Sequence, residues 1–375
     1  LKNSILKNHN ALIEIYEGDS AVYVWSFDKQ AMKITKASKC VYDSLLKLYI
    51  AGLARQPTLK SQVAEWEKAS AALYKLMFAD HHLPVGRIIF SPDRNIIPFE
   101  CLITGYTDNK PRYLIHAAAL SYTYSAAYLQ EVQESGAGNA SANFAGFAPV
   151  RFSPALKLNA LIGSDRSLEK IEDDFRESAI HLGMRATRAS FIEGLGRNNI
   201  MHLYTHAAVN RTTGEPEIYF CDSVLTLNEM VLGSAPTARL INLAACETAL
   251  GKSYYGEGVF SFSRVLASYG IPSSVANVWS VPDKPTYQLN ELFYKFLSEG
   301  MTPDVALQHA KLVFLREAGI ETALPYYWGA SILTGESDIA FPPRKWQFTF
   351  IALAVCVILI GFVWALMRGL ISFKR

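Results

Sequence analysis

The first forty residues alternate between hydrophobic and polar side chains, with breaks at turn-forming residues. Strict alternation is typical of strands with one buried face, so the pattern predicts strands at Ala11–Glu17, Ser20–Phe27 and Ala31–Lys36. The spacing then changes to that of amphipathic helices, which we expect at Lys39–Ala51 and Pro57–Ala79. The pattern therefore predicts a β-meander followed by two helices.

Beyond residue 85, short hydrophobic runs alternate with amphipathic segments. Such alternation favours a mostly parallel sheet that is covered by helices on both faces. The predicted strands are Arg87–Ser91, Tyr113–Leu120, Asn143–Phe147, Ile200–His206, Glu217–Cys221, Arg239–Ala245, Ser274–Trp279 and Tyr326–Leu333. The predicted helical segments are Ser167–Leu182, Gly258–Tyr269, Pro285–Glu299 and Pro303–Glu317.

Two of these strands lead to reactive side chains. One ends at His206 and another runs into Cys246, and the separation of 246 − 206 = 40 residues leaves room for a crossover between neighbouring parallel strands. A histidine can take the proton of a thiol and later deliver one to a leaving amine. Small residues such as Ala207 let backbone N–H groups approach a substrate oxyanion. From the pattern alone, a core cysteine beside a hydrogen-bonded histidine is the commoner arrangement.

Composition and charge narrow the function classes. Half of the 375 residues are hydrophobic and 19% are charged, which predicts a globular protein. The 36 basic and 34 acidic residues are scattered, with a net charge of +2, so we expect no nucleic-acid partner. The five cysteines lie far apart and have no metal-ligand spacing, so we expect no bound metal and no cofactor. Their odd number and their hydrophobic surroundings are typical of free thiols in a reducing compartment.

A hydrophobic segment near the end of the chain predicts a membrane anchor. Residues Phe348–Met367 carry no charge over about 20 positions, the length that a helix needs to cross a bilayer. Basic residues flank the segment on both sides and Trp346 precedes it, as is typical of membrane interfaces. We expect a single-pass protein of the cell membrane, with the globular part in the cytoplasm.

Several longer motifs resemble those of the CHAT family, whose caspase-like domains often follow tetratricopeptide repeats. The motifs are RIIFSPDRNIIPFECL, IMHLYTHAAVN, LINLAACETALGKSYYGEGVFSFSRVLASYGIPSSVANVWSVPD and PYYWGASILTG. The resemblance implies a caspase-like three-layer α/β sandwich with a mostly parallel central sheet. The hydrophobic pattern places the small meander with its helices before this sandwich and one transmembrane helix after it. It also implies a cysteine endopeptidase in which Cys246 is the nucleophile and His206 the general base and acid, with protein or peptide substrates. The backbone N–H groups of Ala207 and Cys246 would then form the oxyanion hole.

The resemblance and the hydrophobic pattern together divide the chain. Residues 1–84 form the meander and helices, as part of the CHAT domain or packed on it, and residues 85–338 form the catalytic domain. A linker at 339–347, the transmembrane helix at 348–367 and a short basic tail at 368–375 follow. Because the chain opens on Leu1 rather than Met, we expect it to be a piece of a longer protein. The resemblance implies an amino-terminal repeat region or a sensor partner that activates the enzyme.

Asp283 is the candidate for substrate recognition, since it follows the strand next to the expected cleft. A carboxylate there pairs with a basic residue before the scissile bond in several caspase-like relatives. The alternative is a helix cap, because Asp283 precedes the helix expected from Pro285.

Two rival functions remain open. In the first, the family's usual glycines are replaced by Ala207 and Ala249, and the domain is a catalytically silent docking module at the membrane. In the second, Cys246 is the nucleophile of a cysteine phosphatase. Such enzymes bind phosphate with an arginine six residues after the cysteine, but this chain has Lys252 there, which cannot form the same bidentate contact, and Glu247 would repel a phosphate.

Overall fold

The computed structural model describes residues 6–78, 83–93, 96–135, 140–210, 212, 216–226, 235–247, 257–319 and 322–344, together with 356, 359–361 and 363–364. For residues 134–135, 209, 216, 246–247 and 257–262 the description covers the backbone alone. Within these residues the chain folds around a 13-stranded mixed and largely parallel sheet.

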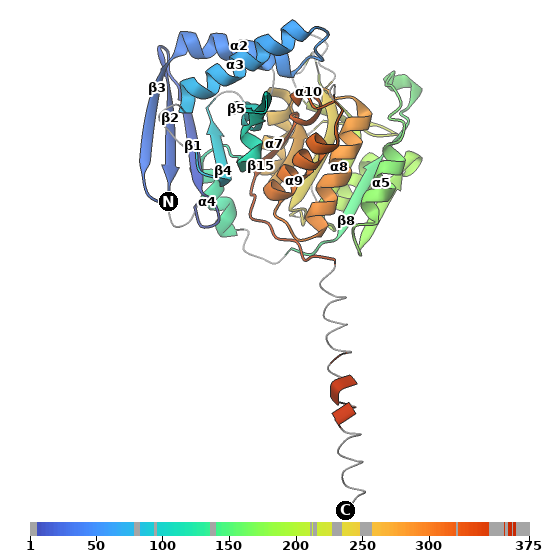
Figure 1. Ribbon diagram of the computed structural model, residues 1–375. Helices are drawn as coiled ribbons and strands as arrows, with labels where there is room; N and C mark the ends of the chain where they lie inside the picture. Colours follow the sequence, from blue (N-terminus) through green and yellow to red (C-terminus); the bar gives the residue numbers. More distant parts are fainter. Residues whose placement is uncertain are drawn as a thin grey trace, which may run out of the picture.

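An antiparallel meander forms one end of this sheet (Figure 1). Its strands are β1 (Ala11–Glu17), β2 (Ala21–Asp28) and β3 (Met32–Ser38), and two helices, α2 (Lys39–Leu53) and α3 (Lys60–Phe78), pack on it. The alternating residues of β1 are buried toward these helices, as the sequence pattern requires. The predicted meander and helices are confirmed to within three residues at each boundary.

The meander joins the rest of the sheet through β1, which pairs in parallel with the next long strand. The elements of this middle part are β4 (Gly86–Pro92), the 3₁₀ turn η1 (Phe99–Cys101), the hairpin β5 (Ile103–Thr107) and β6 (Lys110–Tyr113), η2 (Leu114–His116), β7 (Ala118–Tyr122) and α4 (Ala126–Ser135). The β5–β6 hairpin forms a separate two-stranded sheet.

The remaining strands alternate mostly with helices. These elements are β8 (Phe144–Ala148), η3 (Pro154–Leu156), α5 (Ser164–Glu172), β9 (Ser178–Leu182), η4 (Gly183–Arg185), α6 (Arg188–Leu195), β10 (Ile200–Val209), β11 (Pro216–Tyr219), β12 (Val224–Thr226), β13 (Leu240–Glu247), α7 (Glu257–Ser268), β14 (Ser273–Asn277), α8 (Asp283–Ser298), α9 (Pro303–Glu317), α10 (Pro325–Trp328) and β15 (Ser331–Gly335).

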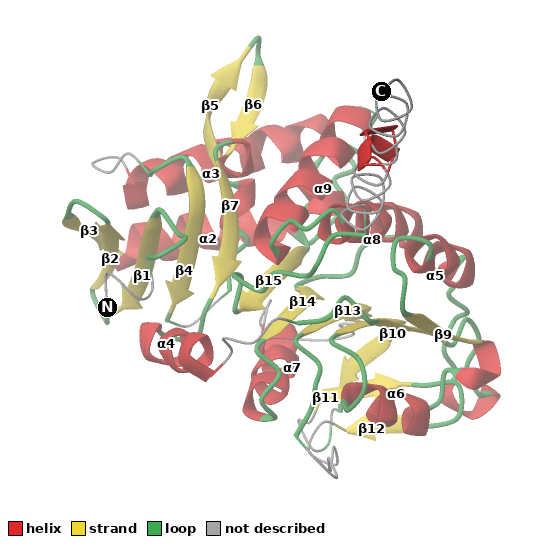
Figure 2. Cartoon of the chain, turned by 90° about the horizontal axis from the view of Figure 1, so that it is seen from below, coloured by secondary structure: helices red, strands yellow, loops and turns green. Residues whose placement is uncertain are grey.

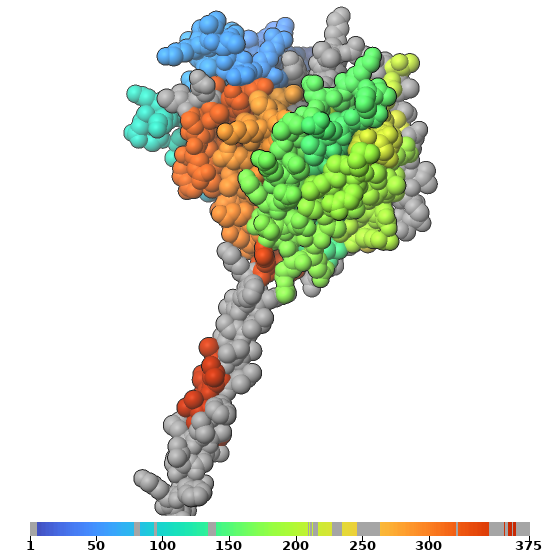
Figure 3. All heavy atoms as spheres, turned by 90° about the vertical axis from the view of Figure 1, so that its right-hand side faces the viewer, coloured from blue at the N-terminus to red at the C-terminus, as the bar shows by residue number. Residues whose placement is uncertain are grey.

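Helices cover both faces of the sheet, which gives the fold three layers (Figure 2). In that view α2, α3, α9, α8 and α5 lie on one side of the strands, and α4 and α7 lie on the other. The strand order is β12-β11-β10-β13-β14-β15-β7-β4-β1-β2-β3, and β8 pairs with both β10 and β9. From the side, the green segment that includes α5 lies against the orange segment that includes α8 (Figure 3).

Three predicted elements were wrong in kind or extent. The expected strand Tyr326–Leu333 begins as the short helix α10, because Pro325 starts a helical turn, and only its last three residues belong to β15. The expected helical segment Ser167–Leu182 is helical only to Glu172 and ends as strand β9. The expected strand Tyr113–Leu120 contains the turn η2 before β7 begins.

The predicted membrane anchor falls largely outside the described residues. Of Phe348–Met367, the structure describes residues 356, 359–361 and 363–364. Among the residues described, no helix has the length and hydrophobicity that crossing a bilayer requires. The anchor, the linker and the domain boundaries stay predictions.

Candidate active site

The two candidate catalytic residues lie side by side on neighbouring parallel strands. β10 pairs with β13, and in this register His206 is aligned with Cys246. Neighbouring strands lie about 4.8 Å apart, and aligned positions of parallel strands share one face of the sheet. The side chain of Cys246 is outside the described part of the chain, so its placement rests on the backbone register. Neither strand stops at the reactive residue, since β10 continues to Val209 and β13 to Glu247.

The imidazole of His206 is held by a backbone carbonyl. Its Nε2 lies 2.9 Å from the carbonyl oxygen of Asn159, and its ring packs against Phe152 with 5.1 Å between ring centroids. Because a carbonyl oxygen only accepts, this contact assigns the proton to Nε2. The other nitrogen, Nδ1, is buried and has no hydrogen-bond partner among the residues described. Nδ1 is therefore the nitrogen with a free lone pair, as a general base requires.

The loop that supplies this carbonyl has a strained backbone. Val150 has a φ of 61°, a region that β-branched residues rarely adopt, and the N–H of Arg151 donates to the carbonyl of Pro149 at 2.6 Å. A second backbone bond from Leu161 to the Val150 carbonyl, 2.8 Å long, closes the loop. Strain of this kind persists where the surrounding structure enforces it, and here it accompanies the contact with His206.

Buried polar contacts anchor β10 below the histidine. The hydroxyl of Tyr204 lies 2.9 Å from Ser167 Oγ on α5, and His202 Nδ1 lies 3.1 Å from the Tyr294 hydroxyl on α8. Burial lowers the pKa of His202 to about 3, so this ring is neutral at physiological pH. His202 and Tyr204 therefore position the strand that carries His206.

Asp283 lies within electrostatic reach of His206. It is the first residue of α8, where the positive end of the helix dipole favours a carboxylate. Burial raises the pKa of the Asp283 carboxyl, and the nearby His206 acts in the opposite direction. Among the residues described, no donor bonds this carboxylate. The structure therefore brings Asp283 to the same edge of the sheet as the two candidate catalytic residues.

The predicted oxyanion position at Ala207 lies in extended backbone. The residue is aligned with Glu247 of β13 and with Ile218 of β11, and it has no positive φ. An alanine fits such backbone without strain, so its replacement of the family's glycine costs nothing conformationally at this position. Ala249 and Lys252 lie outside the described residues, as do the side chains of Glu247 and Glu257.

Sequence reasoning missed the supporting residues Asn159 and Phe152. Asn159 contributes a backbone carbonyl, which any residue type could supply, so no sequence signal identifies it. Phe152 lies in a loop whose path is not encoded by periodicity. Among the residues described, no group of three or more His, Cys, Asp or Glu side chains could hold a metal.

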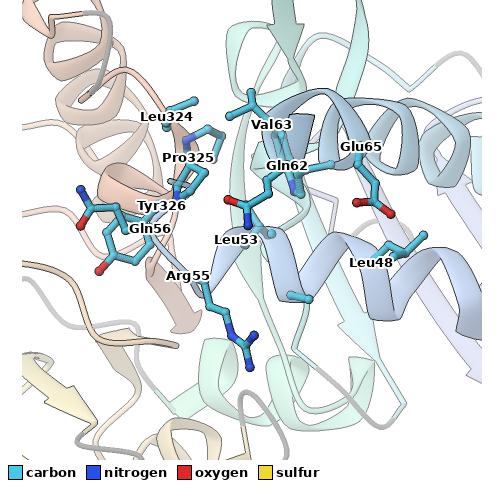
Figure 4. Close-up of a pocket in the computed structure, with 14 residues that line it drawn as sticks. Leu48, Leu53, Arg55, Gln56, Gln62, Val63, Glu65, Leu324, Pro325 and Tyr326 are labelled. Carbon is cyan, nitrogen blue, oxygen red and sulfur yellow. The ribbon is translucent and has the colours of Figure 1, made fainter. Parts of the chain in front are cut away.

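A separate cavity of about 240 Å³ lies between α2, α3 and α10 (Figure 4). Its walls include Leu53, Val63, Trp66 and Tyr326, and none of the predicted site residues. The carbonyl of Tyr326 accepts a 2.9 Å hydrogen bond from the indole of Trp279, which lies in the loop before α8. The cavity is thus distinct from the histidine–cysteine site. Tyr326 links the two, because it contacts the loop between β14 and α8, the helix that begins at Asp283.

The mixed, largely parallel sheet with helices on both faces defines an α/β protein. The chain belongs to the CHAT domain family, whose model matches residues 67–336. The resemblance found in its motifs is therefore confirmed. No curated protein matches the chain in sequence.

Two solved structures show the same fold at low sequence identity. Two crystal structures of the separase–securin complex of Saccharomyces cerevisiae, at 2.6 and 3.0 Å resolution, match with TM-scores of 0.56 and 0.53 and identities of 10% and 9%. Both matches cover 91% of this chain, which spans only 31% and 30% of the matched chains. The Arg-specific cysteine proteinase gingipain R matches with a TM-score of 0.48 and 8% identity, over 81% of this chain and 76% of that one.

Proposed function

We propose that this protein is a caspase-like cysteine endopeptidase that hydrolyses peptide bonds through Cys246 and His206. The observation that carries the proposal is the alignment of these two residues on adjacent parallel strands. The hydrogen bond from His206 to Asn159 supports it, because this bond leaves Nδ1 as the proton acceptor. Membership of the CHAT family supports the same reaction class.

The reaction follows from these positions. His206 Nδ1 takes the proton of the Cys246 thiol, and the thiolate attacks the peptide carbonyl carbon. Backbone N–H groups of Ala207 and Cys246 stabilise the oxyanion of the tetrahedral intermediate. His206 returns the proton to the departing amine, and a water molecule, deprotonated by His206, then hydrolyses the thioester and frees the thiol.

Asp283 confers a preference for arginine or lysine before the scissile bond. Its carboxylate is half-buried beside His206 and lacks a donor among the described residues, so a substrate cation would relieve the cost of its burial. A fluorogenic panel with Arg, Lys, Asp and Leu before the scissile bond tests this. We expect cleavage after Arg or Lys that falls at least tenfold in Asp283→Asn and is lost in Cys246→Ala; preferred cleavage after Asp would contradict the assignment.

The proposal includes a membrane tether at Phe348–Met367 and activation by an amino-terminal region or a sensor partner. The hydrophobic length of the segment supports the tether. Alkaline carbonate extraction of cell membranes tests it: the full chain should stay with the membrane, and a chain ending at residue 344 should be released. Release of both chains would contradict the tether and leave the proposed catalysis untouched.

A further inference from the structure

The outer face of the meander is only partly covered. Helices α2 and α3 pack on one face, and α4 reaches only part of the other, where Leu12, Ile89 and Leu129 cluster. The rest of this face carries aromatic side chains, with Tyr16 58% and Trp25 36% exposed. β1 lies six strands from β10 in the sheet, which corresponds to about 29 Å, so this surface is remote from His206.

These aromatic side chains line a hollow of about 580 Å³, which we call the aromatic hollow. Its walls include the rings of Tyr16, Tyr23, Trp25 and Tyr124, and two carboxylates, Glu14 and Asp93. The strand register explains the arrangement, because Glu14 is aligned with Trp25, and Tyr16 with Tyr23, on neighbouring strands. Tyr16 and Tyr23 lie 6.4 Å apart between ring centroids.

Among the residues described, no cation pairs with the carboxylates of the aromatic hollow. Among the residues described, Glu14 has no ion pair and no hydrogen bond, and burial raises the pKa of its carboxyl with no cation to oppose the shift. Asp93 accepts a 3.0 Å hydrogen bond from the backbone N–H of Glu17 and has no ion pair in the described part of the chain. A half-buried carboxylate without a cation is unfavourable, and a ligand cation would stabilise it.

The rings at the two ends of the hollow already attract cations. Lys36 Nζ lies 5.8 Å from the centroid of Tyr23, and the Arg264 guanidinium lies 5.5 Å from that of Tyr124. Both contacts lie within the range of cation–π attraction. Trp25, which is aligned with Glu14, stacks on Phe27 with 6.2 Å between ring centroids and has no cation–π contact among the described residues. A ligand cation can therefore reach both this indole and the Glu14 carboxylate.

We propose that the aromatic hollow binds an arginine side chain presented by a partner protein. A guanidinium can stack on the indole of Trp25 and at the same time donate to the Glu14 carboxylate, because it is planar and carries several donors. A phosphate or an acidic peptide is excluded by the two carboxylates, and a neutral ligand would leave Glu14 unpaired. This site is independent of the proposed peptidase reaction.

Binding to displayed peptides tests the site. The full chain carrying Cys246→Ala and Asp283→Asn, which removes cleavage and recognition at the proposed substrate cleft, is passed over streptavidin that displays biotinylated Gly-Ser peptides. One peptide has a central arginine and the other a citrulline, its uncharged isostere. Display on a tetravalent surface raises the apparent affinity of a weak single contact.

We expect the arginine peptide to bind at least tenfold more tightly than the citrulline peptide. Glu14→Gln and Trp25→Ala should each weaken arginine binding at least fivefold. Tyr106→Ala, which removes an aromatic side chain that is 54% exposed on β5, and Asp19→Asn, at the turn before β2, are matched controls that should leave binding unchanged.

Equal binding of the two peptides, or binding insensitive to Glu14→Gln and Trp25→Ala, would overturn the proposal. Arg94 follows Asp93 in the sequence but lies outside the described residues. Binding that appeared only after Arg94→Ala would also overturn it, because the hollow would then hold the chain's own arginine.

Discussion

Replacing Lys311 by methionine should destabilise the fold strongly, because it leaves a buried carboxylate without its cation. Lys311 Nζ on α9 lies 2.8 Å from Glu100 Oε1 on η1, and the two side chains are 1% and 3% exposed. The other oxygen of Glu100 accepts a hydrogen bond from the Tyr122 hydroxyl on β7. At 2.8 Å and an effective dielectric constant of 20, Coulomb's law gives an attraction of about 6 kcal/mol. Desolvation offsets part of it, and we expect Lys311→Met to cost about 3–5 kcal/mol.

Urea unfolding followed by circular dichroism measures this loss, with Lys170→Met as the matched control. Lys170 pairs with Glu291 at a similar distance, 3.0 Å, but is 67% exposed, so its removal should cost less than about 1 kcal/mol. Adding Glu100→Gln to Lys311→Met should restore most of the stability, because the buried charge is then gone. Equal losses for the two lysine variants would refute the reasoning.

Three further substitutions test other parts of the fold. Burial raises the pKa of Asp174 to about 6 in the folded state. Ionisation of this carboxyl therefore destabilises the folded state above pH 6, and it has no effect on stability below the pKa that the carboxyl has in the unfolded chain. Asp174→Asn should therefore raise the Tm at pH 7.5, and the gain should vanish near pH 4; a gain that is constant with pH would contradict this. Gly335 has a φ of 100°, and an added Cβ would lie 2.1 Å from the Pro272 carbonyl. Gly335→Ala should cost about 2–5 kcal/mol in urea unfolding, while Gly105→Ala, which meets nothing within 4 Å, should cost little. Arg87→Lys should lower stability by about 1–3 kcal/mol through loss of the guanidinium fork on Asp304, and an unchanged urea midpoint would show that the fork contributes nothing.

The strands and helices with clear periodicity could be predicted from the sequence. β1 was predicted at its observed bounds, and α9 likewise, because each has an uninterrupted pattern with turn or proline signals at its ends. The hairpin β5–β6 was missed because it is short and mostly exposed, and the helix α4 because it is short and has a single fully buried residue, Leu129, among those whose burial is described. The pairing of β1 with β4, which joins the meander to the main sheet, is a long-range contact that local pattern does not encode.

For the candidate site, the sequence points to two reactive residues and one carboxylate, and the roles of all three stay predictions. The strand ends and the family motifs identified His206, Cys246 and Asp283, and the structure aligns the first two and places the third within reach of the histidine. Which imidazole nitrogen accepts the proton depends on the Asn159 carbonyl. That contact depends on the path of a loop with a strained turn at Val150, which no residue pattern specifies.

Alkylation of Cys246 by a small iodoacetamide probe, followed residue by residue with mass spectrometry, tests the central claim most directly. Cys40 is an exposed free thiol and serves as the internal control within the same chain. If His206 activates Cys246, labelling of Cys246 near pH 7 should be at least tenfold faster in the wild type than in His206→Ala, while Cys40 reacts equally in both. Equal labelling of Cys246 in the two proteins, also with an amino-terminal partner present, would contradict the dyad and favour a catalytically silent docking module.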